Sequence, residues 1–361
     1  MTWEEWVSLA ALLLALCAAV VGVLVLNRLA RTRGSAAKPL THAAPSESGE
    51  RAGAPAFIIN PIKVTDAPGL RELARAEARA RGLPEPLWYE TTAEDPGSGQ
   101  ARRAIEAGAS VVVAAGGDGT VRAVAGALAG GTVPMGLIPM GTGNLLARNL
   151  DLPLGDVRSL VRVALEGRTH AVDVGYLSAE GPGLENGSHV FLVMAGLGFD
   201  AAMVAGADHE LKRKVGWFAY FIAGVKHMHG RRLRIRMRID GALPQQRRLR
   251  SLLFANCGRL PGGIVLLPDA EIDDGWLDVA GIDTKGGVFG WASLFGKVIL
   301  QGLGVRRGLP ASPGTIEFWR GHEVEVRMDV PEPVQVDGDL VGDATRVNVT
   351  VRPESLLLRT R

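Results

Sequence analysis

In the stretch Val111-Val112-Val113-Ala114-Ala115-Gly116-Gly117-Asp118-Gly119-Thr120, an apolar run breaks into a glycine-rich turn that holds one carboxylate. The apolar run predicts a buried strand, and the residues from Val121 to Leu128 predict a helix directly after the turn. Backbone N–H groups that glycines leave uncovered can cradle a phosphate, and the helix N-terminus would favour the same ligand. An ordinary tight turn fits equally well, because Gly and Asp are common turn formers.

Predicted strands and helices alternate from residue 56 to residue 150. Short apolar runs predict strands at 56–61, 87–92, 111–116 and 136–139, the first of them stopped by Asn60-Pro61. Between them, helical patterns cover 70–81 and 99–108. This alternation predicts a doubly wound α/β nucleotide-binding domain over residues 56–165.

The pattern changes in the second half of the chain, residues 166–361. Short runs with period-two alternation predict strands at 172–176, 189–194, 233–239, 252–256, 277–282, 315–319, 323–328 and 346–351. We therefore expect a β-sandwich-like second domain, with a C-terminal segment that returns to the first domain. Free strand edges there would allow a homodimer.

An uncharged apolar segment precedes both domains. From Trp6 to Leu26 the chain has 21 residues without a charge, enough to span roughly 30 Å of bilayer. The segment predicts a single transmembrane anchor over residues 1–30, followed by a flexible linker at 31–55. The basic residues behind it place the rest of the chain on the cytoplasmic side of the cell membrane. A cleaved signal peptide is the alternative.

The composition bears on which classes of partner the protein could bind. The net charge is +2 and only 5% of residues are aromatic, which does not favour a nucleic-acid partner. One stretch is locally basic, because Arg232, Arg234, Arg236 and Arg238 alternate with apolar residues. This pattern fits a sheet strand with one solvated face, or a strand whose arginines face anionic lipid headgroups.

A second glycine loop, Gly141-Thr142-Gly143-Asn144, follows the strand predicted at 136–139. Consecutive loops of one parallel sheet open at the same edge, so two such loops indicate a polyphosphate ligand. A P-loop lysine motif is absent from the sequence. A dinucleotide oxidoreductase is the alternative, but its fingerprint belongs after the first strand rather than the fourth.

The second domain supplies carboxylates in two turns. Residues 268–278 are rich in acids, and Asp337-Gly338-Asp339 forms another acidic turn. Asp-Gly is also a common hairpin turn. Phosphoryl transfer, however, needs oxygen ligands for Mg²⁺ and a carboxylate that accepts the proton of the attacking hydroxyl. Phosphate loops and acidic turns together would supply these groups.

The order of these motifs resembles the diacylglycerol kinase catalytic-domain family of lipid kinases, which includes bacterial diacylglycerol kinases and sphingosine and ceramide kinases, with NAD kinases as distant relatives. The resemblance covers residues 56–355. It implies an ATP-dependent lipid kinase that converts diacylglycerol to phosphatidic acid at the membrane. By the same resemblance, ATP would contact Asn60, Thr92, Gly116, Gly117, Asp118, Gly119, Thr120, Gly141, Thr142 and Asn144.

The resemblance also implies the remaining site residues. Asp274 through its side chain, and Glu271 and Trp276 through their carbonyls, would bind Mg²⁺, with Asp173 in the linked acidic network. Asp337 and Asp339 would orient and deprotonate the lipid hydroxyl, and Asp118 would act beside the phosphates.

Two positions depart from the family pattern. Leu145 replaces the usual Asp after the second loop, and Asp339 replaces the usual Glu of the closing turn. These departures keep a lipid-binding pseudokinase open as an alternative, and a sphingoid-base or ceramide kinase is the other. Asp118→Ala and Asp339→Ala would test which reading holds.

Overall fold

The computed structural model describes residues 53–184, 187–198, 232–259, 265–284 and 314–361. They belong to the unit Ala43–Arg361. The predicted transmembrane anchor and most of the linker lie outside these residues. Among the helices of the described residues, none has the length and apolarity needed to cross a membrane.

Four parallel strands form the sheet of the first domain. They are β1 (Pro55–Ile59), β2 (Leu87–Glu90), β3 (Val111–Gly116) and β4 (Met135–Pro139), in the order β4-β3-β1-β2. Every residue of β1, β3 and β4 is buried, as expected for parallel strands covered on both faces. The predicted α/β domain is confirmed.

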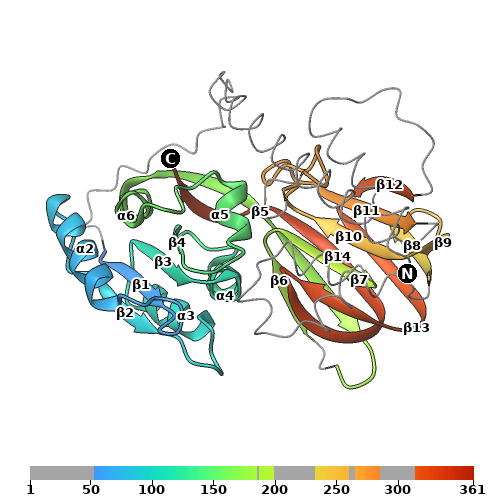
Figure 1. The fold of residues 1–361 in the computed structure, drawn as a ribbon, viewed down its shortest axis with the longest axis horizontal. Coiled ribbons are helices and arrows are strands. Elements are labelled where there is room, and N and C mark those ends of the chain that lie inside the picture. The colour runs from blue at the N-terminus through green and yellow to red at the C-terminus, as the bar shows by residue number, and fades with distance from the viewer. Residues whose placement is uncertain (1–52, 185–186, 199–231, 260–264, 285–313) are drawn as a thin grey trace, which may run out of the picture. The chain divides into compact units, whose positions relative to one another are not determined.

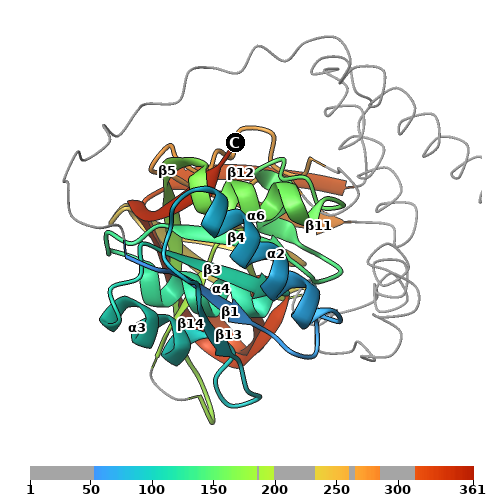
Figure 2. The same cartoon turned by 90° about the vertical axis from the view of Figure 1, so that its left-hand side faces the viewer.

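Helices cover both faces of this sheet (Figures 1 and 2). α2 (Ala67–Ala80) and α6 (Val157–Glu166) lie on one face, and α3 (Ser98–Glu106) and α4 (Asp118–Leu128) on the other. The short helix α5 (Leu145–Asn149) follows the second glycine loop. Asp66 and Asp156 cap α2 and α6 by accepting backbone N–H groups, which explains where these helices begin.

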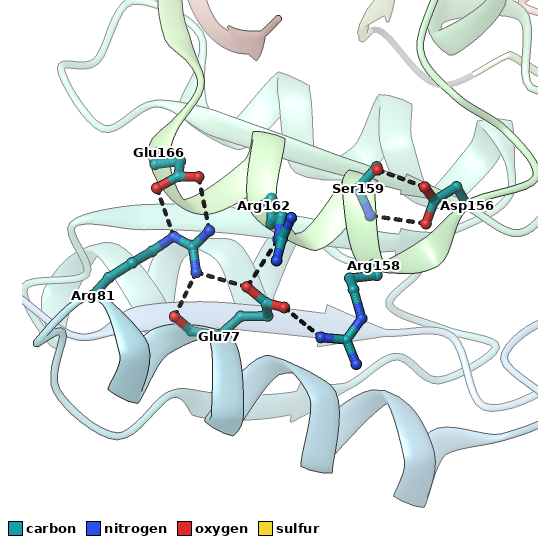
Figure 3. Close-up of polar contacts among 7 residues, drawn as sticks. All are labelled: Glu77, Arg81, Asp156, Arg158, Ser159, Arg162 and Glu166. Atoms are coloured by element: carbon teal, nitrogen blue, oxygen red, sulfur yellow. Dashed lines mark hydrogen bonds and ion pairs between the residues drawn. The ribbon is translucent and has the colours of Figure 1, made fainter.

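A cluster of ion pairs joins α2 to α6 (Figure 3). The carboxylate of Glu77 accepts bonds from Arg81 at 2.7 Å, Arg158 at 3.0 Å and Arg162 at 3.2 Å. Arg81 also contacts Glu166 at 2.7 Å. The hydrogen bond from Arg81, above all, holds the pKa of the Glu77 carboxyl below its usual value.

Antiparallel strands form the second domain, so the predicted β-sandwich-like domain is also confirmed. The strands are β5 (Arg168–Glu180), β6 (Ser188–Phe191), β7 (Met194–Gly198), β8 (Leu233–Ile239), β9 (Gln245–Leu249), β10 (Ser251–Ala255), β11 (Leu277–Thr284), β12 (Gly314–Gly321), β13 (Glu323–Val336) and β14 (Asp339–Thr360). A separate hydrophobic core fills this domain. The polar strand β9 was not predicted, because its residues show no apolar alternation. Pairing with β8 makes it a strand.

The last strand links the two domains. β14 pairs with β13 and β5 along most of its length, and near its end Leu358 pairs in parallel with Met135 of β4. Leu356 and Leu358 are buried in the core of the α/β domain. The end of the chain therefore extends the sheet that carries the glycine loops.

Candidate functional site

The two glycine loops lie in direct contact at the carboxyl edge of the parallel sheet. A Cβ built on Gly141 would lie 2.9 Å from the Cα of Gly117, so only glycine permits this approach. The N–H of Met140 donates to the carbonyl of Gly116 at 2.8 Å. The sequence predicted that these loops share one edge, and the structure brings them into a single surface.

Backbone N–H groups at the start of α4 face this surface. Gly117 is the N-cap residue, and no side chain of the described residues caps the helix. The first-turn N–H groups of a helix have no partner within it, so they remain available to an anion. The helix dipole adds to the attraction. Phosphate binding at this helix start stays a prediction.

The side chain of Asp118 holds the second loop in place. Its carboxylate accepts the N–H of Asn144 at 2.9 Å and the N–H of Leu145 at 2.7 Å, and so caps α5. Asn144 has a left-handed backbone, with φ of 48°, and its side chain bonds both the N–H and the carbonyl of Gly141. Burial raises the pKa of the Asp118 carboxyl. With both oxygens occupied, Asp118 is a positioning residue for the loop.

Asn60 and Thr120 meet where the strand order reverses. β2 and β3 lie on opposite sides of β1, and ligands of such sheets bind at this reversal. Asn60 follows β1, and its amide donates to the hydroxyl of Thr120 at 3.2 Å. Lys63 was not predicted, yet its Cε would lie 4.0 Å from a Cβ built on Gly117. This exposed lysine is positioned to approach a phosphate on the loop.

For two of the predicted ATP-contacting residues, Thr92 and Thr142, the structure shows only their position at the edge of the sheet. Thr92 follows β2, two strands away from the glycine loops, and its hydroxyl accepts the N–H of Asp95 at 3.1 Å. Thr142 lies within the second loop between Gly141 and Gly143. Both residues are at the carboxyl edge, and their contact with ATP stays a prediction.

Asp339 of the second domain reaches the first glycine loop. Its Oδ2 would lie 3.4 Å from a Cβ built on Gly119, and it accepts a bond from Nη2 of Arg122 at 2.7 Å. Arg122, on α4, also donates to the carbonyl of Val336. The Asp339 side chain keeps 55% of its surface exposed, so its carboxylate is accessible to solvent. A carboxylate of the second domain thus lies beside the start of α4.

Asp337 has a different environment from Asp339. Its carboxylate accepts three backbone N–H groups, from Leu192 at 2.8 Å, Val193 at 3.0 Å and Met194 at 2.9 Å. Burial raises the pKa of this carboxyl, while these three bonds oppose the shift. Because its acceptor positions are occupied by backbone, Asp337 anchors the turn that presents Asp339.

The acidic turn between β10 and β11 is neutralised by an arginine. Asp274 accepts the N–H of Trp276 at 3.0 Å and Nη2 of Arg320 at 2.8 Å. Arg320 also contacts Asp278 at 3.1 Å and the carbonyl of Asp269 at 2.7 Å. A Mg²⁺ ion bound to Asp274 would have to displace this guanidinium.

The other predicted metal residues lie in or beside the turn that carries Asp274. Asp173 is fully buried and accepts the N–H groups of Gly275 at 2.6 Å and Glu354 at 2.8 Å. The ring of Trp276 packs against that of His322 in a tilted arrangement, and Glu271 lies in the same turn as Trp276. In the described ranges no group of three or more His, Cys, Asp or Glu residues is arranged to hold a metal ion. Mg²⁺ therefore stays a prediction.

Sequence reasoning missed three residues of this region: Lys63, Arg122 and Arg320. Lys63 has a weak signal, because it lies three residues after Asn60. Arg122 lies in a predicted helix, and Arg320 directly follows the strand predicted at 315–319. Nothing in their local sequence indicates their acidic partners, which lie far away in the chain.

Both domains match families of known proteins. Residues 57–177 match the diacylglycerol kinase catalytic domain, and residues 193–360 match the YegS C-terminal NAD kinase beta sandwich-like domain. A protein of Xanthomonas euvesicatoria named "Probable lipid kinase YegS-like" is 34% identical over 252 residues, which cover 66% of this chain and 76% of that protein.

Two further similarities are informative. A diacylglycerol kinase of Mycobacterium tuberculosis is 31% identical over 177 residues, 49% of this chain and 56% of that protein. The crystal structure of a diacylglycerol kinase from Bacillus anthracis superposes with a TM-score of 0.63 at 17% identity, covering 87% of this chain and 99% of that chain. At this identity the structural likeness concerns the fold alone.

Proposed function

Because the chain belongs to the family of YegS-like lipid kinases, we propose that it transfers the γ-phosphoryl group of ATP to the hydroxyl of diacylglycerol. The name of the mycobacterial relative supports the choice of diacylglycerol. The observation that most supports this proposal is the position of Asp339, whose carboxylate lies against Gly119 at the start of α4.

In the proposed reaction the phosphates of ATP lie over the contacting loops 116–120 and 141–144. First-turn N–H groups of α4 hold phosphate oxygens, and Lys63 adds a positive charge beside Gly117. Positioning and electrostatic stabilisation are the main sources of rate acceleration in phosphoryl transfer. These loops provide both.

The proton of the lipid hydroxyl passes to Asp339. As the proton leaves, the hydroxyl oxygen attacks the γ-phosphorus of ATP. The bond between that phosphorus and the β–γ bridging oxygen then breaks. The products are phosphatidic acid, ADP and a proton released from Asp339 to solvent. Arg122 holds the carboxylate at its place, and Asp337 holds the turn that carries it.

We also propose that the reaction takes place at the cytoplasmic surface of the cell membrane. The uncharged segment from Trp6 to Leu26 supports this location, because it would keep the enzyme close to its lipid substrate. The anchor and a homodimer both stay predictions.

The test is a transfer assay with the purified full chain in mixed micelles. ATP labelled on its γ-phosphate is offered with diacylglycerol, sphingosine, ceramide or NAD, in separate reactions. Labelled phosphatidic acid at the highest rate supports the proposal. Preferred labelling of sphingosine or ceramide contradicts the substrate, and no transfer to any acceptor by folded protein contradicts the activity.

A further inference from the structure

An arginine-rich outer face covers three neighbouring strands of the second domain. In β8, Leu233, Ile235 and Met237 are buried, whereas Arg234 and Arg236 between them are exposed. Since successive side chains of a strand point to opposite faces, β8 turns its apolar side to the core and its arginines to solvent. The core therefore does not account for these arginines.

The strand register places more arginines beside them. Arg234 lies directly opposite Arg248 of β9, and Arg236 lies directly opposite Arg327 of β13. We call these four exposed residues the arginine face. Like charges directly opposite one another destabilise a sheet. The fold thus keeps two unfavourable pairs on one surface.

Nearby carboxylates do not neutralise the arginine face. Glu325 lies on the same side of β13, but it contacts Arg238 and Arg346, each at 3.7 Å. Asp329, two residues beyond Arg327, is exposed as well. Within the part of the chain that the structure describes, no ion pair joins any of the four arginines to a carboxylate. Their charges are open to an external anion.

We propose that the arginine face docks onto the anionic phospholipid surface of the bilayer that holds the lipid substrate. This inference rests on the proposed function, which brings the enzyme to a bilayer. A guanidinium binds phosphate oxygens in a bidentate manner, and cytoplasmic leaflets carry anionic lipids. A sheet face that exposes four arginines, none ion-paired within the described residues, is complementary to such a surface in charge.

A nucleic acid is the other polyanion to consider. The chain has a net charge of only +2 and 5% aromatic residues, which disfavours that partner. The experiment therefore includes nucleic acid as a competing outcome.

Arginine footprinting tests the proposal without requiring catalysis. The full chain is reconstituted in nanodiscs of phosphatidylcholine, or of phosphatidylcholine mixed with phosphatidylglycerol, and is treated with phenylglyoxal in the absence of ATP. Mass spectrometry then measures the modification rate of each arginine. We expect phosphatidylglycerol to slow modification of the arginine face several-fold, and to leave the exposed Arg79 and Arg102 of α2 and α3 unchanged.

Two other results would overturn the docking proposal. One is equal modification of the arginine face in both kinds of nanodisc. The other is protection by inorganic phosphate or by a DNA duplex in micelles, without protection by phosphatidylglycerol. Because the footprint needs no turnover, protection without kinase activity would contradict only the proposed function, and activity without protection only the docking.

Matched variants connect docking to turnover. Arg236→Gln with Arg327→Gln removes one opposed pair, and Arg79→Gln with Arg102→Gln removes two exposed arginines elsewhere. With diacylglycerol in nanodiscs, phosphatidylglycerol should increase the activity of the first variant about tenfold less than that of the unmodified protein. The second variant should be stimulated as strongly as the unmodified protein. Both should match the unmodified protein in micelles. Equal stimulation of the two variants would contradict the proposal.

Discussion

Nη2 of Arg122 lies 2.7 Å from Oδ2 of Asp339, and this contact joins α4 of the first domain to β14 of the second. The same guanidinium binds the carbonyl of Val336, so it holds the acidic turn from both sides. The position of the proposed proton acceptor therefore depends on the helix whose start binds the phosphates.

Replacing Asp339 tests the proton acceptor. Asp339→Asn keeps the size of the side chain but removes its basicity, so we expect the transfer rate to fall about a thousandfold. ATP binding and the thermal midpoint should change little, because the side chain is half exposed. Asp343→Asn, on the exposed part of the same strand, is the control. An Asp339→Asn enzyme with nearly full activity would exclude this residue as the base.

Replacing Arg122 tests its role as a positioning residue. Arg122→Gln should lower kcat roughly tenfold to a hundredfold, because the carboxylate is no longer held in place. KM for ATP should change much less. Arg122→Lys keeps a charge that can reach Asp339, and we expect it to recover part of kcat. Steady-state kinetics with both variants decides this, and a change in KM alone would speak against positioning.

The contact between the glycine loops predicts a size limit at Gly141. In Gly141→Ala the new Cβ would lie 2.9 Å from the Cα of Gly117 and 3.0 Å from Oδ1 of Asn144, so one loop must shift. Overpacking of this kind costs about 1–3 kcal/mol. We expect ATP affinity to fall roughly tenfold in titrations with a fluorescent ATP analogue.

Gly155 provides the control for this substitution. A Cβ at Gly155 would meet nothing within 4 Å, and its φ is not in the left-handed region. Gly155→Ala should therefore bind ATP like the unmodified protein. If Gly141→Ala binds ATP equally well, the loops do not form the nucleotide site.

Glu77 predicts a pH-dependent contribution to stability. Glu77→Gln leaves three arginines without their shared carboxylate and should destabilise the protein by about 1–3 kcal/mol at neutral pH. The pKa of Glu77 is lower in the folded than in the unfolded protein. Its contribution is therefore complete above the unfolded value and is lost as the pH falls through the folded value.

Thermal unfolding as a function of pH measures this effect. The difference in Tm between the unmodified protein and Glu77→Gln should shrink as the pH falls below about 4. Glu72→Gln, at an exposed position of the same helix, should leave Tm nearly unchanged at every pH. A Tm difference that grows in acid would contradict the assignment.

The ion pairs of Arg320 with the acidic turn lead to a prediction about the thermal stability of the protein in the presence of a chelator. Since its guanidinium already binds Asp274 and Asp278, removal of divalent ions with EDTA should leave Tm unchanged. Arg320→Ala should lower the stability by about 1–3 kcal/mol, because it leaves both carboxylates without this partner. Arg168→Ala removes an exposed arginine and serves as the control. A large loss of Tm in EDTA alone would indicate a structural metal ion instead.

Local sequence patterns were sufficient for most of the α/β domain. The apolar run at 111–116 and its glycine turn predicted β3 and the start of α4. Both signals consist of residues that are adjacent in the sequence. In the second domain, β8 was predicted with the bounds it has and β9 was not predicted, while several other strands were predicted too short, as in β14, which extends from Asp339 to Thr360. Its length depends on pairing with β5 and β13, which a local pattern does not contain.

The sequence by itself determined the two glycine loops, the helix that follows the first of them, and the presence of carboxylates in the second-domain turns. Tertiary structure alone decided what each carboxylate does. Asp118 caps α5, Asp337 is occupied by backbone N–H groups, and Asp339 reaches Gly119 and Arg122. The reason is physical: a turn forms from adjacent residues, whereas the hydrogen-bond partners of a carboxylate come from whichever distant strands and helices pack beside it.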